Sequence, residues 1–501
     1  MSRTPLTDAL LRNGKGPVLP MHMPGHKRNP ALWSSPELAA LLPFDITEIE
    51  GFDNLQAPSG LLRELNGRLS ALWGSRDSFA LVNGSTVGIL AGLHALVSPG
   101  DTVLAARNCH LSVLNALTLL AAKPVWLEPA RNEQGLYGPL CPDLVREALQ
   151  THPGARVLVL TSPTYEGVVS PLPDLVKLCR RFGVRVFVDE AHGAHLRFLA
   201  DPVPDAMSAG ADLAVQSLHK TLPSPTQTAV LHVGEAGPDS ACVAASLKIF
   251  QTSSPSYVLL AGIEQCASFL EEAGKEAFRN YGMSLKDFRA FAKKLSRLRL
   301  LSPESVKLFF KNSCYYDESK LFLSSVTDLY CGPRLAARLR ALGVEPEMVT
   351  PFGVLLMTSV ADRQTTFSGL KTILQILDRE EESLPVPPCR PGCAAPARIL
   401  PPSPLTPFEA GKKLDGPETK KDPLDPASRD DVALEALYAY PPDIPLLMPG
   451  EKCGTLDGPG AALLSAYLDP ALGGTLLTSS GPFDGKLPVC GPVCTGTDPT
   501  F

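Results

Sequence analysis

Two short stretches in the middle of this chain carry residues whose types and spacing could do chemistry together. VRVFVDEAHGAH contains Asp189 and His192, and ADLAVQSLHKTL contains Ser217, His219 and Lys220. In each stretch an apolar, β-branched run ends in polar groups, which predicts a buried strand followed by a polar turn. A carboxylate can keep a pyridine nitrogen protonated, and a deprotonated lysine can form an imine with an aldehyde. The two stretches are therefore a candidate site for pyridoxal phosphate.

Lys220 and Asp189 each have a plainer interpretation as well. A lysine at a strand end can be a surface residue, and an aspartate after a strand can cap a turn. Lys220 follows an apolar strand rather than lying on a charged helix face, so we expect it to point into a cleft. Partial desolvation there would favour the neutral amine. We predict that Lys220 forms the imine and that Asp189 pairs with the pyridine nitrogen.

The sequence NGST, which contains Gly84, Ser85 and Thr86, could hold the phosphate group. It opens a helical pattern, and the free backbone N–H groups at a helix start bind phosphate. Gly84 would let the backbone approach closely. An ordinary N-cap explains Ser85 or Thr86 equally well. Ser217 and His219 could add further phosphate contacts.

Two other histidines could contact the cofactor ring. His110 ends a predicted strand, where an imidazole can stack on a planar ring, although a lone histidine is more often structural. His192 follows Asp189 by three positions and could reach the ring face or its phenolic oxygen. The 9 histidines do not cluster at metal-ligand spacing, and we expect no metal site. P-loop, H-E-x-x-H and G-x-S-x-G motifs do not occur in the sequence.

The elements that must position these residues lie between about Phe79 and Leu231. Short runs of Val, Leu and Ala alternate there with helical stretches. This pattern predicts an α/β fold with a mainly parallel sheet covered on both faces. Ligands of such sheets bind beyond the carboxyl ends of the strands. All the candidate groups follow predicted strands, so one rim of the sheet should collect them.

The remaining sequence predicts a smaller domain and a C-terminal extension. From about Lys320 the pattern reads β-α-β-β-α, which is typical of a small α+β domain. A Pro-rich stretch and the charged run GKKLDGPETKKDP follow and predict a linker or a solvated loop. We therefore divide the chain into an N-terminal segment (1–78), a cofactor-binding large domain (79–310), a small α+β domain (311–382), a Pro-rich, charged linker (383–430) and a C-terminal domain (431–501).

Composition and charge argue against a nucleic-acid partner, a membrane-spanning segment and secretion. The net charge is -6, and no basic stripe suggests nucleic acid. No apolar run is long enough to span a membrane, and the N-terminal sequence lacks the apolar region of a signal peptide. The 12 cysteines are scattered, which indicates reduced thiols, and the pairs Cys389/Cys393 and Cys490/Cys494 lack the tighter spacing of most structural zinc sites. We expect a cytoplasmic protein.

With these residues established, the chain resembles the Orn/Lys/Arg decarboxylases of bacterial type. These are pyridoxal phosphate enzymes with an aspartate-aminotransferase-like large domain of fold type I. The likeness is carried in order by PLTDALL, MHMPGHKRNP, DITEIEGFDNLQAPSG, FALVNGSTVGILA, ARNCHLS, TSPTYEGVV, FVDEAHGAHLRF, SLHKTL, QTSSPSY and YPPDIPLLMPGE. It covers about Pro5–Tyr257 well and the rest loosely.

The resemblance implies a role for each matching position. Lys220 looks like the Schiff-base lysine, Asp189 like the partner of the pyridine nitrogen, and His110 like the histidine that stacks on the ring. Other cofactor contacts would come from Gly84, Ser85, Thr86, His192, Ser217 and His219. In the family QTSSPSY lies at a dimer interface, so Ser253 and Ser254 could serve the cofactor of a partner subunit, and we expect a homodimer or a higher homo-oligomer.

The function implied is decarboxylation of a basic amino acid, with arginine the first expectation and lysine or ornithine after it. A pocket for the substrate's distal cation should contain an acid, and Glu347 or Asp53 could serve. Two departures from the family pattern are Leu111, where a lysine is usual, and Asp443, where a glycine is usual. The alternatives are another reaction of the same fold, such as aminotransfer or aldol cleavage, and a non-catalytic, regulatory homologue.

Overall fold

The structure is a computed structural model that describes most of the chain in two compact units. The described residues are 3–15, 19–132, 134–310, 314–327, 331–383, 403, 405–414, 416–417, 419–423, 431–439, 444–453, 477–479 and 486–490. The first unit comprises Met1–Leu96, Arg185–Gly282 and Ser359–Ala361, and the second comprises Val97–Val184, Met283–Thr358 and Asp362–Phe501.

Some of the sequence-based expectations fall on positions that the structure does not describe. Asp443, Cys389, Cys393, Cys494 and much of the predicted linker lie outside the described residues. The domain boundaries given above stay predictions.

The first unit contains four strands in the order β1-β8-β7-β6. Their bounds are Asp77–Leu81 for β1, Ala229–Val233 for β8, Leu213–Ser217 for β7 and Arg185–Asp189 for β6. β6 and β7 run parallel, whereas β8 is antiparallel to both β7 and β1. The connection from β7 to β8 explains this reversal. It holds one short helix, α8 (Leu218–Thr221), and a parallel crossover needs about a dozen residues or more, usually as a longer helix.

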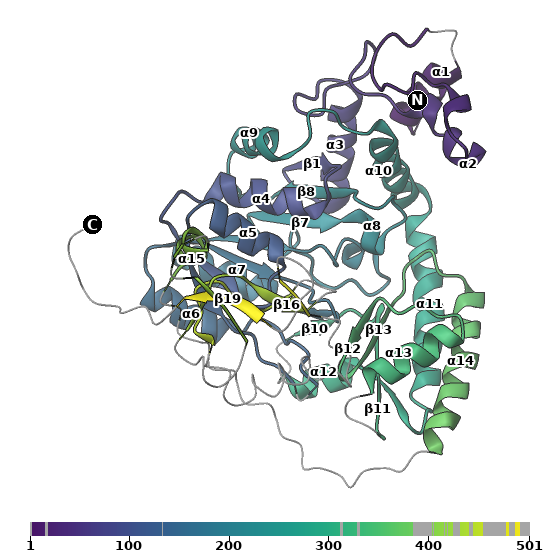
Figure 1. Cartoon of the computed structure of the whole chain (residues 1–501). Coiled ribbons are helices and arrows are strands. Elements are labelled where there is room, and N and C mark those ends of the chain that lie inside the picture. The colour runs from purple at the N-terminus through teal and green to yellow at the C-terminus, as the bar shows by residue number, and fades with distance from the viewer. Residues whose placement is uncertain are drawn as a thin grey trace, which may run out of the picture. The chain divides into compact units, whose positions relative to one another are not determined.

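Helix α4 (Gly84–Leu96) packs closely along these strands, as Figure 1 shows. Two glycines make this approach possible. A Cβ atom at Gly88 would lie 2.5 Å from Cγ2 of Val215, and one at Gly92 would lie 2.7 Å from the ring of Phe187. Real Cβ atoms do not tolerate such contacts, so the two glycines fix the distance between α4 and the sheet, and with it the position of the helix N-terminus.

The other helices of the first unit precede and follow this sheet. They are α1 (Pro5–Lys15), η1 (Pro30–Leu32), α2 (Pro36–Ala39), η2 (Leu42–Phe44), α3 (Leu61–Trp73), η3 (Leu196–Phe198), α9 (Ser240–Phe250), α10 (Tyr257–Phe269) and the π-helical turn η4 (Leu270–Gly274). Helix α11 (Lys275–Ala292) has residues in both units. The buried carboxylate of Glu264 accepts the N–H groups of Leu6 and Thr7 at 2.8 and 2.7 Å, which holds the first turn of α1 against α10.

The second unit begins with three parallel strands in the order β4-β2-β3. These are β2 (Thr102–Ala106), β3 (Lys123–Leu127) and β4 (Ala155–Thr161), and their helices are α5 (Leu111–Leu119), α6 (Pro142–Thr151) and α7 (Leu172–Arg181). The expected α/β class with a mainly parallel sheet is therefore confirmed. Strand β3 is hard to recognise in the sequence, since KPVWL contains a lysine and a proline that weaken the strand signal.

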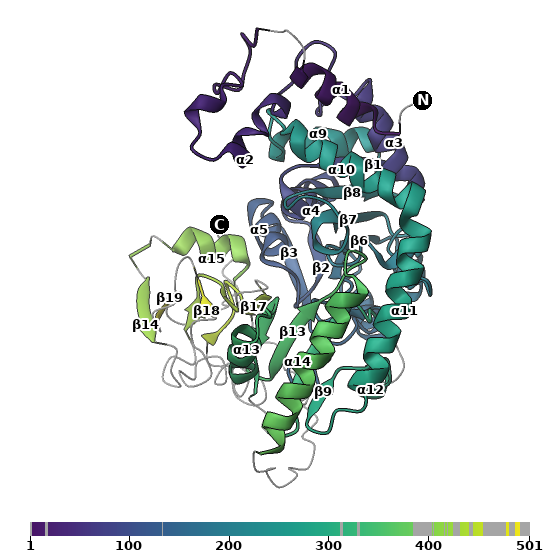
Figure 2. The ribbon, with the colours of Figure 1, turned by 90° about the vertical axis from the view of Figure 1, so that its right-hand side faces the viewer.

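A four-stranded antiparallel sheet of order β12-β13-β11-β9 forms the smaller α+β part of the second unit. Helices α13 and α14 pack on it, as Figure 2 shows. The bounds are β9 (Leu298–Leu300), β11 (Lys320–Ser325), α13 (Gly332–Ala341), β12 (Met348–Thr350), β13 (Gly353–Met357) and α14 (Gln364–Glu382). The predicted β-α-β-β-α order is thus present, and β9 joins it as a further strand.

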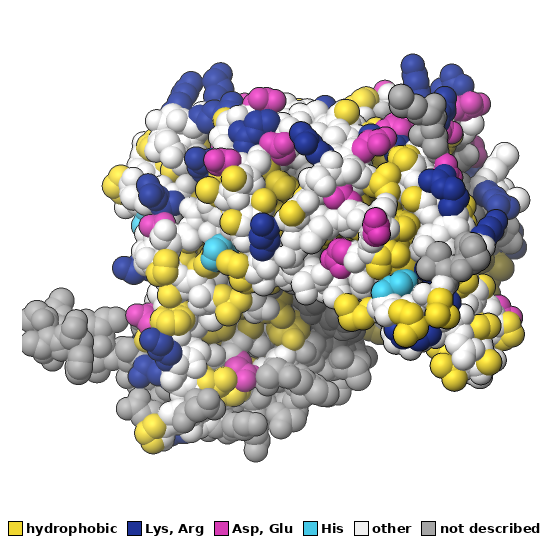
Figure 3. Space-filling model, turned by 90° about the horizontal axis from the view of Figure 1, so that it is seen from above, with side chains coloured by type: hydrophobic (Ala, Val, Ile, Leu, Met, Phe, Trp, Pro, Cys, Tyr) yellow, Lys and Arg dark blue, Asp and Glu magenta, His cyan; other side chains and the backbone are white. Residues whose placement is uncertain are grey.

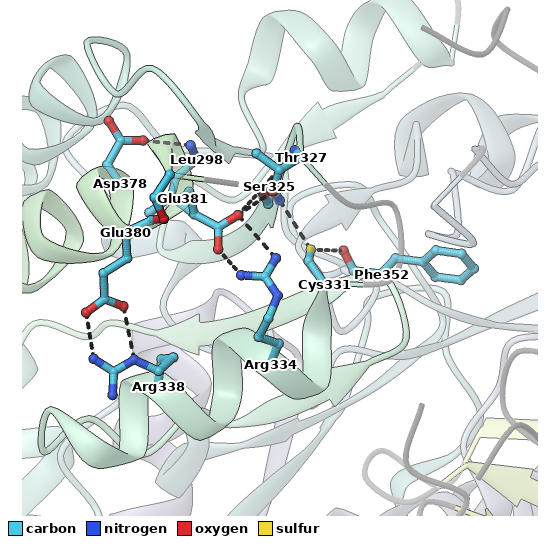
Figure 4. Close-up of polar contacts among 11 residues, drawn as sticks. Leu298, Ser325, Thr327, Cys331, Arg334, Arg338, Phe352, Asp378, Glu380 and Glu381 are labelled. Carbon is cyan, nitrogen blue, oxygen red and sulfur yellow. Dashed lines mark hydrogen bonds and ion pairs between the residues drawn. The ribbon is translucent and has the colours of Figure 1, made fainter. Parts of the chain in front are cut away.

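Acidic residues of α14 fasten this helix to the sheet and to α13, as Figure 4 shows. Asp378 accepts the backbone N–H of Leu298 at 2.8 Å. Glu381 is buried and accepts the hydroxyls of Ser325 and Thr327, both at 2.5 Å, and it forms an ion pair with Arg334. All these groups are satisfied within the fold, which indicates a structural role.

The second unit also contains a number of shorter elements. They are β5 (Val168–Val169), α12 (Pro303–Phe309), β10 (Tyr315–Tyr316), α15 (Pro407–Lys413), β14 (Lys420–Pro423), β15 (Val432–Ala433), β16 (Leu437–Ala439), β17 (Ile444–Leu447), β18 (Leu477–Thr478) and β19 (Lys486–Cys490). On the face drawn in Figure 3, charges of both signs are interspersed among apolar side chains. Within the described ranges no helix has the length and apolar character needed to cross a bilayer.

Candidate active site

The first unit brings the two chemically suggestive stretches together at the carboxyl ends of neighbouring parallel strands. Asp189 is the last residue of β6 and pairs with Val215 of β7, two residues before that strand ends at Ser217. Asp189 is buried, and its Oδ1 atom accepts the N–H of Ala191 at 3.2 Å. A buried carboxylate at this rim is suited to pairing with a cationic ring nitrogen.

Lys220 lies on a turn of helix rather than at the end of the strand. Strand β7 is followed by the short helix α8 (Figure 1). The strand ends at Ser217, and α8 contains His219 and Lys220. The side chain of Lys220 is half-buried, and its Nζ atom lies 3.1 Å from Nε2 of the buried His192. The sequence places these two residues in separate stretches, and the fold joins them by a direct polar contact.

A second contact joins the start of α4 to the end of β7. The hydroxyl of Ser217 donates to that of Ser85 at 3.0 Å. Gly84 has a φ of +73°, and no atom lies within 4 Å of where its Cβ would be. Thr86, the other hydroxyl of this turn, is exposed. Backbone N–H groups at a helix start, two neighbouring hydroxyls and open space above Gly84 together fit a phosphate group.

His219 uses one of its two ring nitrogens for a contact with the backbone, and its predicted contact with the phosphate stays a prediction. Its Nδ1 atom lies 3.0 Å from the carbonyl oxygen of Thr228, which can only accept, so Nδ1 carries the proton. Burial, and then the charge of Lys220, lower the pKa of His219 below its usual value. The lowered pKa favours the neutral ring, in which the Nε2 atom accepts hydrogen bonds instead of donating them.

His110 belongs to the second unit and caps helix α5. Its Nδ1 atom accepts the backbone N–H of Ser112 at 3.1 Å and lies 2.7 Å from the Ser112 hydroxyl. Because Nδ1 is an acceptor, the proton of the neutral ring sits on Nε2. The cap fixes the orientation of the imidazole, whereas its predicted contact with the cofactor ring stays a prediction.

Ser253 and Ser254 are exposed, and the segment that carries them is tied to the NGST turn. The N–H of Thr252 donates to the side chain of Asn83 at 3.1 Å, and the side chain of Gln251 accepts the N–H of Val82 at 3.2 Å. These contacts hold the segment while the two serine side chains face solvent. Their predicted contact with the cofactor of a partner subunit stays a prediction.

Asp53 and Glu347, the two acids considered for the substrate's distal cation, differ in their hydrogen-bond partners. Asp53 accepts backbone N–H groups at the start of α3, including those of Gly60 at 2.7 Å and Leu62 at 3.1 Å. Burial alone would raise the pKa of Asp53, but these hydrogen bonds lower it below its usual value, so its carboxylate is already used. Glu347 is exposed and accepts the hydroxyl of Tyr165, which follows strand β4.

A buried polar chain beneath the rim was not predicted. The Glu190 carboxylate accepts the side-chain N–H of Gln216 at 2.7 Å, and the Gln216 oxygen lies 3.1 Å from Nε2 of His232. Burial, and then the charge of Asp205, raise the pKa of Glu190 well above its usual value. Gln216 and His232 interrupt apolar strands, and that interruption is the signal in the sequence that could have identified them.

Comparison with known proteins shows which family this chain belongs to. The model of the family described as Orn/Lys/Arg decarboxylase, major domain, matches residues 4–321. A Bacillus subtilis protein named as uncharacterized protein YaaO is 32% identical over 461 residues, which cover 90% of this chain and 92% of that protein. An arginine decarboxylase of the same organism is 29% identical over 456 residues, which cover 89% and 91% of the two chains.

A solved structure supports the fold. The lysine decarboxylase LdcF of Francisella novicida superposes with a TM-score of 0.77 at 18% sequence identity, and the match covers 98% of this chain and 81% of that one. At this level of identity the likeness concerns the fold, and it agrees with the expected class.

Proposed function

This chain belongs to the Orn/Lys/Arg decarboxylase family, and we propose that it uses pyridoxal phosphate to decarboxylate a basic amino acid to the corresponding amine and CO2. The observation that carries this proposal is the contact of 3.1 Å between Lys220 Nζ and His192 Nε2, on the rim that also holds the buried Asp189. A structural lysine would need no such partners.

The residues of the rim fit the cofactor that the family implies. Lys220 would hold its aldehyde carbon, Asp189 its pyridine nitrogen, and the start of α4 with Ser85 and Ser217 its phosphate. When bound, pyridoxal phosphate supplies a cationic ring that accepts the electron pair left behind as the carboxylate departs. His110 would contribute a flat face against that ring.

The reaction requires proton transfers that side chains of this protein must carry out. Lys220 Nζ has to lose a proton to act as a nucleophile, and the Nε2 atom of a neutral His192 at 3.1 Å can accept a hydrogen bond from it. After CO2 leaves, a proton has to reach the α-carbon of the substrate, and Lys220 is the group that we assign to deliver it. His219 is less suited, because its free Nε2 atom carries no proton when the ring is neutral.

We propose arginine as the first substrate, with lysine and ornithine after it. The relatives named as arginine decarboxylases match over most of both chains, which favours arginine. Of the two acids considered, we assign Glu347 to the distal cation, because Asp53 is occupied by backbone donors.

We also propose a cytoplasmic homodimer. Among the described residues, Cys141, Cys242, Cys266 and Cys314 are free thiols, as expected in a reducing compartment. The exposed Ser253 and Ser254 are available to a second copy.

Product analysis tests the proposal. Protein loaded with pyridoxal phosphate is incubated separately with arginine, lysine and ornithine, and the products are identified by mass spectrometry. Agmatine, cadaverine or putrescine would support decarboxylation. A keto acid would indicate aminotransfer, glycine would indicate aldol cleavage, and no product from any substrate would favour a regulatory homologue.

A further inference from the structure

A buried ion pair connects the C-terminal part of the second unit to the loop that carries His110. Arg107 follows strand β2 and is fully buried, and Glu451 is 1% exposed. The guanidinium donates from Nε and Nη2 to the two carboxylate oxygens of Glu451, at 3.0 and 2.9 Å. This two-point geometry fixes the direction of both side chains.

The surrounding backbone completes the enclosure of the guanidinium. Arg107 also donates to the carbonyl oxygens of Pro445 at 2.5 Å and Leu446 at 3.2 Å. The N–H of Met448 donates to Glu451 Oε2 at 2.8 Å. Burial alone would lower the pKa of Arg107, but the charge and hydrogen bonds of Glu451 raise it above its usual value, so the guanidinium keeps its charge.

The turn that presents Glu451 requires a glycine. Gly450 has a φ of +92°, and a Cβ atom there would lie 2.1 Å from the carbonyl oxygen of Leu405. The N–H of Gly450 donates to the carbonyl of Ala433 at 2.7 Å, and the N–H of Ala433 donates to that of Glu451 at 2.9 Å. The carboxylate is thus held on a rigid support.

Arg107, the other residue of the ion pair, lies three positions before His110. The N–H of Arg107 donates to Leu127 at 2.8 Å, and the N–H of Cys109 donates to Ala106 at 3.1 Å, so residues 107–109 form a tight turn before His110. Helix α15 packs on α5, the helix that His110 caps (Figure 1). The C-terminal part therefore contacts this loop on both sides of His110.

We propose that Glu451 is a positioning residue for the decarboxylation, because through Arg107 it fixes the loop that carries His110. The inference rests on the proposed function, since it takes His110 to be the stacking residue. Stability alone does not require a charged pair here, because well-packed apolar residues often stabilise a buried site equally well. An ion pair with two-point geometry does specify one position of the loop.

Two variants and one matched control test this role in the full-length protein loaded with pyridoxal phosphate. Glu451→Gln removes the charge that Arg107 faces. The double variant R107M/E451L removes both charges and leaves no unpaired ion, which protects the fold if Glu451→Gln destabilises it. Glu381→Gln is the control, because Glu381 is an equally buried partner of an arginine in the same unit (Figure 4). Its contacts are with Ser325, Thr327 and Arg334, not with the loop of His110.

Activity per folded molecule and the visible circular dichroism of the bound cofactor are measured with arginine, lysine and ornithine. We expect both Glu451 variants to lose kcat by on the order of 100-fold, with altered dichroism and little change in KM, as for a small displacement of a reacting group. Glu381→Gln should keep its kcat and its dichroism.

An R107M/E451L protein with the kcat and dichroism of the wild type would overturn the positioning role, as would losses that merely follow the folded fraction in all three variants. A wild-type protein that releases no CO2 would contradict the proposed function itself, so the two failures are distinguishable.

Discussion

Lys220 and His192 are separated by 28 positions in the sequence, and the Nζ of one lies 3.1 Å from the Nε2 of the other. His192 follows the buried Asp189 at the end of β6, and Lys220 follows the buried Ser217 at the end of β7. Because β6 and β7 run parallel, both polar turns leave the sheet at the same edge. The contact is thus a direct consequence of the topology.

Replacing His192 tests whether this contact serves proton transfer. His192→Asn should lower kcat by roughly 100-fold, the lower range for loss of a general acid or base, with the cofactor still bound. The measurement is steady-state amine formation by the loaded enzyme. His94→Asn is the control, since His94 is a half-buried histidine of the same unit that contacts Ser246 at 2.9 Å. An unchanged kcat in folded His192→Asn would refute the assignment.

We expect the hydroxyls of Ser217 and Ser85 to contribute to cofactor binding through the phosphate group alone. Each change to alanine should weaken pyridoxal phosphate binding by roughly fivefold, the value of one hydrogen bond. Absorbance titration measures this, with pyridoxal, which lacks the phosphate, as the second ligand. Ser70→Ala is the control, because the Ser70 hydroxyl only donates to the carbonyl of Asn66 at 3.0 Å. Equal losses for the two ligands would argue against a phosphate site here.

Glu347→Gln should raise the KM for arginine by roughly 10-fold and leave kcat nearly unchanged, since a contact to a distal cation contributes to binding and not to the chemical step. The matched control is Glu345→Gln, which removes an exposed carboxylate that accepts from Arg340 at 2.8 Å. If both variants keep the wild-type KM for all three amino acids, the distal cation is bound elsewhere.

His232 should make the fold sensitive to acid. Burial, and then the charge of Arg197, lower the pKa of His232 to about 3. Below about pH 6.5 the unfolded chain therefore binds a proton that the native state does not, and stability falls as pH decreases, by at most about 1.4 kcal/mol per pH unit.

Urea unfolding of wild type and His232→Gln at several pH values between about 8 and 5 measures this effect. We expect the wild type to be more stable at the highest pH, because His232 hydrogen-bonds Ser78 at 2.7 Å and Gln216 at 3.1 Å. The difference should shrink as the pH falls. A constant difference would show that His232 does not titrate as proposed.

Local patterns were sufficient to predict most elements and the α/β class. The strand that ends in Asp189 and the helix that starts at Gly84 follow from apolar runs and a turn. The reversal of β8 and the helical setting of Lys220 depend on how a short connection closes, which the strand pattern alone does not determine.

Long-range contacts were beyond prediction. The partner of Arg107 lies 344 positions away, and no local pattern relates it to Glu451. The use of Asp53 as a backbone acceptor likewise depends on the start of α3 folding around it. For this reason the sequence left Asp53 and Glu347 as equal candidates, whereas their surroundings separate them.

The most direct test of the central claim follows the carboxyl carbon. Wild-type protein and Lys220→Ala, both incubated with pyridoxal phosphate, are given arginine, lysine and ornithine labelled in the α-carboxylate. We predict that the wild type releases the label as CO2 in equal amount with the amine, and that Lys220→Ala loses both this release and the visible absorbance of the bound cofactor. Label that stays in an organic product, or release that persists undiminished in Lys220→Ala, would contradict the account.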